Sequence, residues 1–175
     1  MSHFPKILAN TLHHEGGWSD HPKDPGGATM KGVTMKTYSD YLGRPATKDE
    51  LRRIPADHLE AIYRKGYWEK VRGDELAEIA PGLAAAVFDF AVNSGPGRAA
   101  KALQGLCGAV TDGAIGPNTM KQVKAWVELM GPDKAIDAYQ AFRQDYLQSL
   151  DTFVTFGKGW TRRIEEMTAF GKGHT

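Results

Sequence analysis

A stretch that is apolar on nearly every side constrains this fold most. Residues 82–93 consist of Gly-Leu-Ala-Ala-Ala-Val-Phe-Asp-Phe-Ala-Val-Asn, and they lie between Pro81 and a Ser-Gly-Pro-Gly run at 94–97. A helix without a polar face has to be surrounded by other elements. Proline starts, capping residues and glycine ends also recur on both sides of it. We therefore expect a mainly α (α+β) fold packed around this central helix, with one small β-hairpin region.

The remaining elements follow from the same signals. Helices are expected over residues 4–14, 34–42, 56–68, 98–106, 118–129, 132–150 and 158–170, with a short one begun by a capping box at Thr47–Glu50. A Pro-Gly-Gly turn between short flanks rich in Thr and Val predicts the hairpin between residues 18 and 34. Because no linker is long enough to separate two domains, residues 1–175 are expected to form a single domain.

Composition excludes several classes of protein. With 22 basic and 21 acidic side chains and a net charge of +1, the chain is not built to bind nucleic acid. Its single cysteine, Cys107, cannot form an intramolecular disulfide and is expected to be a buried small hydrophobe. No apolar run reaches the roughly 18 residues of a membrane span. The sequence has neither a signal-peptide layout nor metal-ligand spacing, so we expect cytoplasmic synthesis and no cofactor or metal.

Glu15 has the most suggestive position for chemistry. It follows the expected first helix and precedes Gly16-Gly17, which ends that helix. A negative charge at the C-terminal end of a helix is disfavoured by the helix dipole. This position, with partial cover from Trp18, favours the protonated carboxylic acid that a general acid needs.

A second carboxylate lies in the next turn. Cleavage of a glycosidic bond needs one carboxyl group to protonate the leaving oxygen and another to activate water or to stabilise the sugar cation. Asp24, in a Pro- and Gly-rich turn, can fold back toward Glu15, and the Thr29 hydroxyl could hold a water molecule. The alternative is that residues 24–27 are only a turn and that Glu15 is a solvated helix end.

These residues resemble a known family. Residues 15–18 (Glu-Gly-Gly-Trp), 24–29 (Asp-Pro-Gly-Gly-Ala-Thr) and 32–34 (Gly-Val-Thr) are similar to the N-terminal signature of glycoside hydrolase family 108. Its members are N-acetylmuramidases of the lysozyme superfamily from phages and bacteria. The resemblance implies a lysozyme-like fold with Glu15 as the essential acid, although Trp18 replaces the usual tyrosine. The spacing of Glu15, Asp24 and Thr29 is also similar to the Glu-Asp-Thr triad of phage-type lysozymes, with the third role open between Thr29 and Thr34.

The second half of the chain carries two further resemblances. Residues 112–119 (Asp-Gly-Ala-Ile-Gly-Pro-Asn-Thr) are similar to a loop of peptidoglycan-binding modules. The alternative is that they form an Asp-Gly turn and a helix start with a structural role alone. The resemblance implies a catalytic segment over 1–94 and a peptidoglycan-binding-like helical segment over 95–175, packed on the first. Residues 157–163 resemble the Gly-Trp-x-x-Arg stretch of phage-type lysozymes, and we expect them to close the domain, with Arg163 ion-paired.

Other polar and aromatic residues are candidates for binding sugar. Asp89 and Asn93 share one face of the apolar helix; we expect Asp89 to form an internal network and Asn93 to line the sugar cleft. Tyr63 and Trp68 belong to an aromatic cluster that either packs in the core or stacks on sugar rings. The predicted substrate-binding residues are Trp18, Thr34, Tyr63, Trp68 and Asn93.

The sequence thus predicts a lysozyme that cleaves the β-1,4 bond between N-acetylmuramic acid and N-acetylglucosamine of bacterial peptidoglycan. A monomeric phage or prophage endolysin, released to the wall by a holin and not inserted in the membrane, fits these expectations; a bacterial wall-remodelling enzyme is the other origin. Two other functions stay open. A lytic transglycosylase would use Glu15 without water, and a non-catalytic wall-binding protein would recruit secretion machinery.

Overall fold

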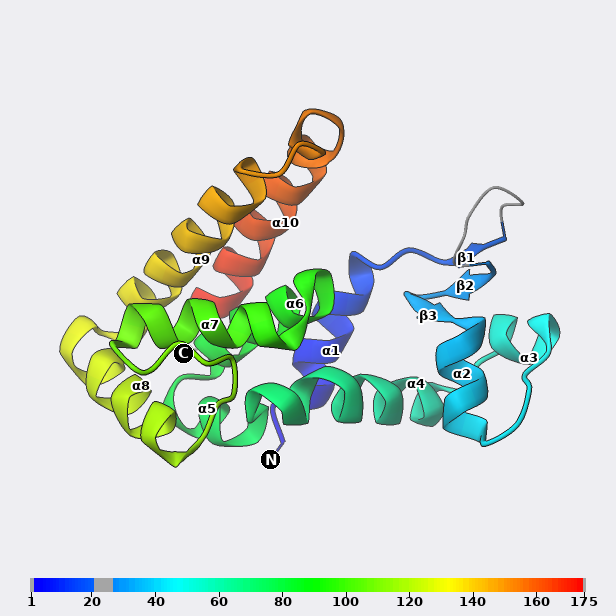
Figure 1. The fold of residues 1–175 in the computed structure, drawn as a ribbon, viewed down its shortest axis with the longest axis horizontal. Helices are drawn as coiled ribbons and strands as arrows, with labels where there is room; N and C mark the ends of the chain where they lie inside the picture. Colours follow the sequence, from blue (N-terminus) through cyan, green and yellow to red (C-terminus); the bar gives the residue numbers. More distant parts are fainter. Residues whose placement is uncertain (1, 21–26, 175) are drawn as a thin grey trace. The chain divides into compact units, whose positions relative to one another are not determined.

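The computed structural model describes residues 2–20 and 27–174 (Figure 1). The chain forms two compact units, Pro5–Lys65 and Met1–Phe4 with Gly66–Thr175. Helices α6 (Pro81–Ser94) and α7 (Pro96–Cys107) pack against each other inside the larger unit, and the expected division into segments 1–94 and 95–175 stays a prediction.

The smaller unit combines four helices with a short sheet. Its elements are α1 (Phe4–His13), β1 (Trp18–Ser19), β2 (Thr29–Met30), β3 (Val33–Thr34), α2 (Met35–Leu42), α3 (Lys48–Arg52) and α4 (Ala56–Tyr63). The strands pair antiparallel in the order β1-β2-β3, so the predicted hairpin is the β2–β3 part of a three-stranded sheet. Ser19, Thr29 and Thr34 form one cross-strand row, and Trp18, Met30 and Val33 form the next.

Local capping explains the ends of two of these helices. The Thr34 side chain accepts a hydrogen bond from the backbone N–H of Thr37 and caps α2, which ends at Gly43 in the left-handed conformation. The predicted capping box also forms, since Thr47 accepts from the Glu50 backbone and the Glu50 side chain accepts from the Thr47 backbone.

The larger unit is helical and surrounds α6. Its other helices are α5 (Gly73–Ile79), α7, α8 (Pro117–Met130), α9 (Pro132–Gln148) and α10 (Phe153–Lys172), and α6 contacts α5, α7, α9 and α10. All side chains from Leu83 to Ala91 are fully buried, which confirms the predicted central helix. Helices α6 and α10 approach each other closely at Gly82 and Gly171. A Cβ at Gly82 would lie 2.2 Å from the carbonyl oxygen of Gly171, so this approach requires a residue without a side chain. Helices α9 and α10 run side by side (Figure 1).

The residues after α4 differ from the expected continuous helix. The chain forms a π-helical turn, η1 (Arg64–Trp68), and a 3₁₀ turn, η2 (Glu69–Val71), before α5. Trp68 is fully buried, with its ring centroid 5.1 Å from that of Phe4 and 5.6 Å from that of Phe88. Gly73 accommodates it, since a Cβ there would lie 2.1 Å from the indole. Trp68 is therefore a core residue, and its ring has no exposed face for a sugar.

A buried ion-pair cluster crosses the core of this unit. The Asp89 carboxylate is fully buried and contacts Nη1 of Arg143 at 2.8 Å and Nη2 of Arg163 at 2.8 Å. Burial alone would raise the pKa of Asp89, but the two guanidinium groups outweigh it and lower that pKa. The expectation of an internal network around Asp89, with Arg163 ion-paired, is thus confirmed.

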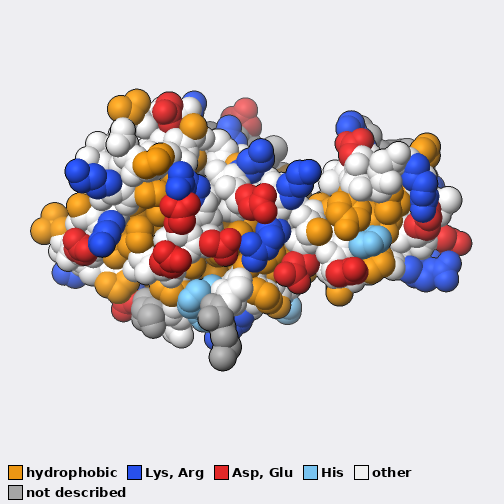
Figure 2. All heavy atoms as spheres, turned by 90° about the horizontal axis from the view of Figure 1, so that it is seen from below, with side chains coloured by type: hydrophobic (Ala, Val, Ile, Leu, Met, Phe, Trp, Pro, Cys, Tyr) orange, Lys and Arg blue, Asp and Glu red, His pale blue; other side chains and the backbone are white. Residues whose placement is uncertain are grey.

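The surface charges and the helix lengths can be described for the visible face and the described helices. In Figure 2, acidic and basic side chains are interspersed over the visible face instead of forming a continuous basic surface. Among the described helices, none combines the length and apolar character needed to cross a membrane.

Candidate active site

Glu15 lies directly after the first helix, as predicted. Helix α1 ends at His13, and the backbone N–H groups of His14 and Glu15 donate to the carbonyls of Thr11 and Leu12 at 3.0 and 3.2 Å. Gly16 then takes a left-handed φ of 72° and turns the chain away from the helix. The half-buried Glu15 side chain is thus held at a rigid helix end.

The turn between β2 and β3 contacts the Glu15 carboxyl group. Lys31 and Gly32 form this two-residue turn with φ of 46° and 78°, the positive values of a type I′ hairpin turn. A Cβ at Gly32 would lie 2.9 Å from Oε2 of Glu15 and 2.6 Å from the hydroxyl oxygen of Tyr63. The two side chains therefore border the same small space beside Gly32.

Tyr63 ties this turn to α4. Its ring is 2% exposed, and its hydroxyl donates to the carbonyl oxygen of Lys31 at 2.7 Å. On the other side of the turn, the N–H of Lys31 donates to the carbonyl oxygen of Gly17 at 3.3 Å. Because Tyr63 is buried, it offers little ring surface for stacking on a sugar, which was its predicted role.

The other candidates of the smaller unit lie on its sheet. Thr29 and Thr34 are direct cross-strand partners. The Thr34 hydroxyl is engaged in capping, with Thr37 Oγ1 at 3.0 Å and the Thr37 N–H at 3.1 Å. Trp18 is half-buried beneath the guanidinium of Arg52, which lies 5.6 Å from the ring centroid. Asp24 lies outside the described residues, so its role stays a prediction.

Two predicted residues fall in the larger unit instead. Trp68 is in the core, as described above. Asn93 is half-buried near the end of α6, where its Oδ1 accepts from the hydroxyl of Ser94 at 3.2 Å. Its role in a sugar cleft stays a prediction.

The loop at 112–119 has an evident structural role. The buried Gln104 amide donates from Nε2 to Asp112 Oδ1 at 2.7 Å and to the Ala114 carbonyl at 3.2 Å, while its Oε1 accepts from the Gly113 N–H at 2.8 Å. Cys107 on the same helix is buried as expected, and burial raises the pKa of its thiol. The Gln104 hydrogen bonds stabilise the loop conformation, and a peptidoglycan-binding role of residues 112–119 stays a prediction.

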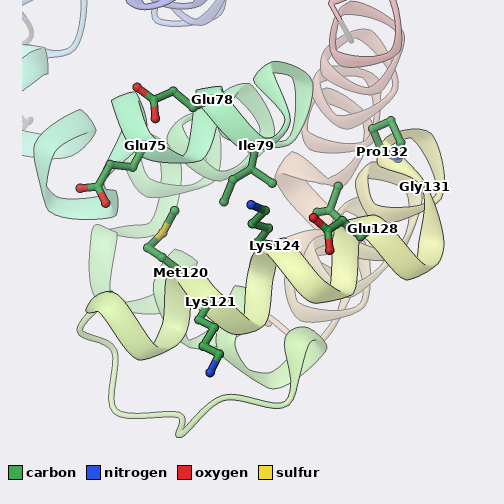
Figure 3. Close-up of a pocket in the computed structure, with 10 residues that line it drawn as sticks. Glu75, Glu78, Ile79, Met120, Lys121, Lys124, Glu128, Gly131 and Pro132 are labelled. Carbon is green, nitrogen blue, oxygen red and sulfur yellow. The ribbon is translucent and has the colours of Figure 1, made fainter.

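The larger unit also contains a pocket of about 810 Å³ between α5 and α8 (Figure 3). Ile79, Met120 and Val127 supply its apolar lining, and exposed glutamates and lysines form its rim. Lys124 points from α8 toward Ile79, whereas Lys121 points away (Figure 3). None of the predicted site residues that the structure describes lines this pocket.

Lys31 and Gly32 border the Glu15 carboxyl group but were not among the predicted site residues. A Lys-Gly pair between two short β-prone segments is compatible with a two-residue hairpin, in which glycine supplies positive φ. That signal could have located the turn. It could not have shown that the turn contacts Glu15.

The mainly helical fold, the small antiparallel sheet and a glutamate at the end of the first helix define a lysozyme-like class of protein. The comparisons agree with this class. The family model described as Glycosyl hydrolase 108 matches residues 8–95. The chain is also similar to the solved structure titled "Structure of Brucella abortus SagA", with 40% sequence identity, a TM-score of 0.80, and coverage of 98% of this chain and 94% of that chain. No match was found among curated proteins. The chain therefore belongs to glycosyl hydrolase family 108, and its family is one of glycoside hydrolases.

Proposed function

We propose that this protein is a muramidase that hydrolyses the β-1,4 bond between N-acetylmuramic acid and N-acetylglucosamine in bacterial peptidoglycan. The observation that carries the proposal is the Glu15 carboxyl group, half-buried at the end of α1 and placed against the Lys31–Gly32 turn. It lies within the segment that matches the family model. In the proposed reaction, Glu15 donates its proton to the glycosidic oxygen as the bond breaks.

The second role is assigned to Asp24. Its ionised carboxylate would position the attacking water or stabilise the positive charge that develops on the sugar, and the Thr29 hydroxyl would help to hold that water. These roles follow by analogy those of lysozymes, in which one carboxyl group is the acid and the other stays ionised. For Asp24 the assignment rests on the resemblance in sequence.

Sugar binding is assigned to residues that keep accessible surface. Trp18 retains part of its ring surface and can stack on a sugar face. Asn93 supplies polar groups for hydroxyl and N-acetyl substituents, whereas the Thr34 hydroxyl is engaged in capping α2 and takes no binding role in this proposal. No metal or cofactor takes part in the proposed reaction.

The biological setting is proposed from the same chemistry. The partner is bacterial peptidoglycan, and the site of action is the cell wall. Synthesis in the cytoplasm, release through a holin, a phage origin and a monomeric state stay predictions.

Release of soluble fragments from purified peptidoglycan tests the proposal. Glu15→Gln removes the acid but keeps the shape of the side chain, so we expect a fall in rate of at least about 100-fold. Glu60→Gln on α4 is the matched control and should retain wild-type activity. Asp24→Asn should lower the rate as well, because an amide cannot act as a base. A Glu15→Gln protein that folds and keeps most of its activity would refute the assignment.

The alternatives give different results in the same assay. A lytic transglycosylase would yield anhydro-muramic acid ends and would tolerate Asp24→Asn, because the substrate's own hydroxyl replaces water. A wall-binding accessory would cosediment with peptidoglycan and release nothing.

A further inference from the structure

Gly32 is the point at which three parts of the smaller unit meet. A side chain at this position would overlap both the Glu15 carboxylate, 2.9 Å from the Cβ site, and the Tyr63 hydroxyl, 2.6 Å from it. Real Cβ atoms do not approach other atoms so closely, so the close packing of these groups requires glycine here. The positive φ of 78° at Gly32 is a second reason for glycine at this position, because residues with a Cβ rarely adopt it.

The turn that presents Gly32 is strained and is held from two sides. Lys31 has a left-handed φ of 46°, which is unfavourable for a residue with a Cβ. Strained backbone persists where surrounding contacts fix it, and such sites are concentrated in functional regions. Here the contacts are the hydrogen bond from the Tyr63 hydroxyl to the Lys31 carbonyl and that from the Lys31 N–H to the Gly17 carbonyl.

Both contacts bear on Glu15. Gly17 follows Glu15 by two positions, so its bond to Lys31 fixes the chain immediately after the acid. Tyr63, almost fully buried on α4, fixes the turn whose Gly32 face borders the Glu15 carboxylate. The carboxyl group thus rests against a surface whose place is set by Tyr63.

We propose that Tyr63 is a positioning residue for Glu15, and that Gly32 is the surface through which it acts. Tyr63 does not stack on the substrate in this assignment. Its hydroxyl holds the Lys31–Gly32 turn, and the turn holds the carboxyl group in one place. The consequence for catalysis rests on the proposed function, whereas the placement of Glu15 does not.

The expected effects follow from how sensitive proton transfer is to geometry. A misplacement of about 1 Å can lower a rate by roughly 100-fold. Tyr63→Phe keeps the buried ring and removes only the hydroxyl, so kcat should fall at least about tenfold while KM stays within about twofold. Gly32→Ala adds a methyl group that would lie 2.6 Å from the Tyr63 hydroxyl and 2.9 Å from the Glu15 carboxylate, so we expect it to displace both groups and to disturb the contact that positions Glu15. Its kcat should fall by about 100-fold.

Gly43→Ala is the matched control for backbone strain. Gly43 has a φ of 68°, close to that of Gly32, but a Cβ there meets nothing within 4 Å. Both alanine variants therefore carry similar strain, and only the one at position 32 displaces Glu15. Thermal unfolding of every variant is measured to check that the proteins compared are folded.

The test has two readouts on the full chain. The first is kcat and KM on soluble, uncrosslinked glycan strands. The second is the ¹³C signal of the Glu15 carboxyl carbon in glutamate-labelled protein, identified by its absence in Glu15→Gln, and it does not depend on activity. We expect this signal to shift in Tyr63→Phe and in Gly32→Ala and to stay unchanged in Gly43→Ala.

The outcomes separate this proposal from the proposed function. An unshifted Glu15 signal with wild-type kcat in both Tyr63→Phe and Gly32→Ala would overturn the positioning role while leaving the muramidase intact. An equal loss of kcat in Gly43→Ala and Gly32→Ala would also overturn it, since strain alone would then explain the effect. A wild-type chain that releases nothing would reject the proposed function, and the carbon signal would still decide the placement.

Discussion

Thr29 and Thr34 lie opposite each other on β2 and β3, but only the Thr34 hydroxyl is engaged in capping a helix. It accepts the N–H of Thr37 at the start of α2. This difference gives the two threonines separate expected roles. Thr34 stabilises the fold, and Thr29 remains the better candidate for the water-holding hydroxyl.

Substitution of each threonine should separate stability from activity. Thr34→Ala removes the N-cap of α2 and should lower the free energy of unfolding by about 1 kcal/mol, with little change in rate. Thr29→Val keeps the side-chain shape, and we expect it to lower the rate with little change in stability. Urea unfolding and fragment release measure the two effects. An inactive Thr34→Ala beside a fully active Thr29→Val would assign the third catalytic role to Thr34.

Removal of the buried Asp89 carboxylate should strongly destabilise the larger unit. Asp89→Asn leaves Arg143 and Arg163 without a buried counter-charge and should lower the free energy of unfolding by about 3–5 kcal/mol. Asp137→Asn is the matched control, because the exposed Asp137–Lys172 pair contributes about 1 kcal/mol or less. Denaturant unfolding gives the free energy of unfolding of both variants. Equal values for Asp89→Asn and Asp137→Asn would contradict the expected role of the buried carboxylate.

The same pair predicts how stability depends on pH. The pKa of Asp89 is lowered in the folded state, so its contribution is complete above the unfolded pKa of about 3.9 and is lost as pH falls through the folded value. Thermal unfolding of the wild type should therefore move to lower temperature as the pH is lowered below about 4. A milder variant, Arg163→Lys, should be less stable at neutral pH, because lysine cannot form the two-pronged contact with the carboxylate.

The capping box predicts an unusual titration of Glu50. The Arg44 guanidinium, followed by the Thr47 backbone and hydroxyl, lowers the pKa of Glu50 from 4.5 to about 2. Because the folded pKa is lowered, the stabilisation is present above pH 4.5 and is lost between there and pH 2. Carboxyl-carbon NMR should give this value in the wild type and a value closer to 4.5 in Arg44→Ala. Arg53→Ala, which leaves the Arg44 contact in place, should not change it; an unshifted Glu50 pKa in the wild type would refute the geometry.

A substitution that relieves the backbone strain at Lys31 should stabilise the protein. Lys31→Asn places at φ 46° a residue that tolerates the left-handed region, and Asn-Gly is the favoured pair of a type I′ turn. We expect the free energy of unfolding to rise by about 0.5–1 kcal/mol, part of the roughly 1–2 kcal/mol that this region costs other residues. Lys31→Gln removes the same charge, but glutamine does not tolerate the left-handed region as asparagine does. We therefore expect no rise in its free energy of unfolding. Equal effects of the two changes would show that charge is the cause.

Much of the fold could be predicted because its helices begin and end with local signals. Pro81 and Pro132 start helices where expected, and the helix expected over residues 34–42 is capped by Thr34 and ends at Gly43. Helix α5 lacked such a signal, since its N-cap, Arg72, makes no side-chain cap. Helix α10 begins at Phe153, earlier than the expected residue 158, and includes Gly157, over which the Phe153 ring packs: a Cβ at Gly157 would lie 2.7 Å from that ring.

The site was predictable only where its residues are close in sequence. The position of Glu15 at a helix end follows from the glycines after it. Its proximity to Tyr63 depends on how α4 packs on the β2–β3 turn, which no local pattern specifies. The aromatic residues near the end of α4 were compatible with both core packing and sugar stacking, and only burial distinguishes the two.

Mass spectrometry of the ends of released fragments tests the central claim most directly. Purified peptidoglycan is digested in ¹⁸O-water by the wild type and by Glu15→Gln, with Glu60→Gln as the control. The account predicts reducing N-acetylmuramic acid ends that carry one ¹⁸O from the wild type and the control, formed at least about 100-fold more slowly by Glu15→Gln. Unlabelled anhydro ends, or labelled ends formed by Glu15→Gln at close to the wild-type rate, would contradict it.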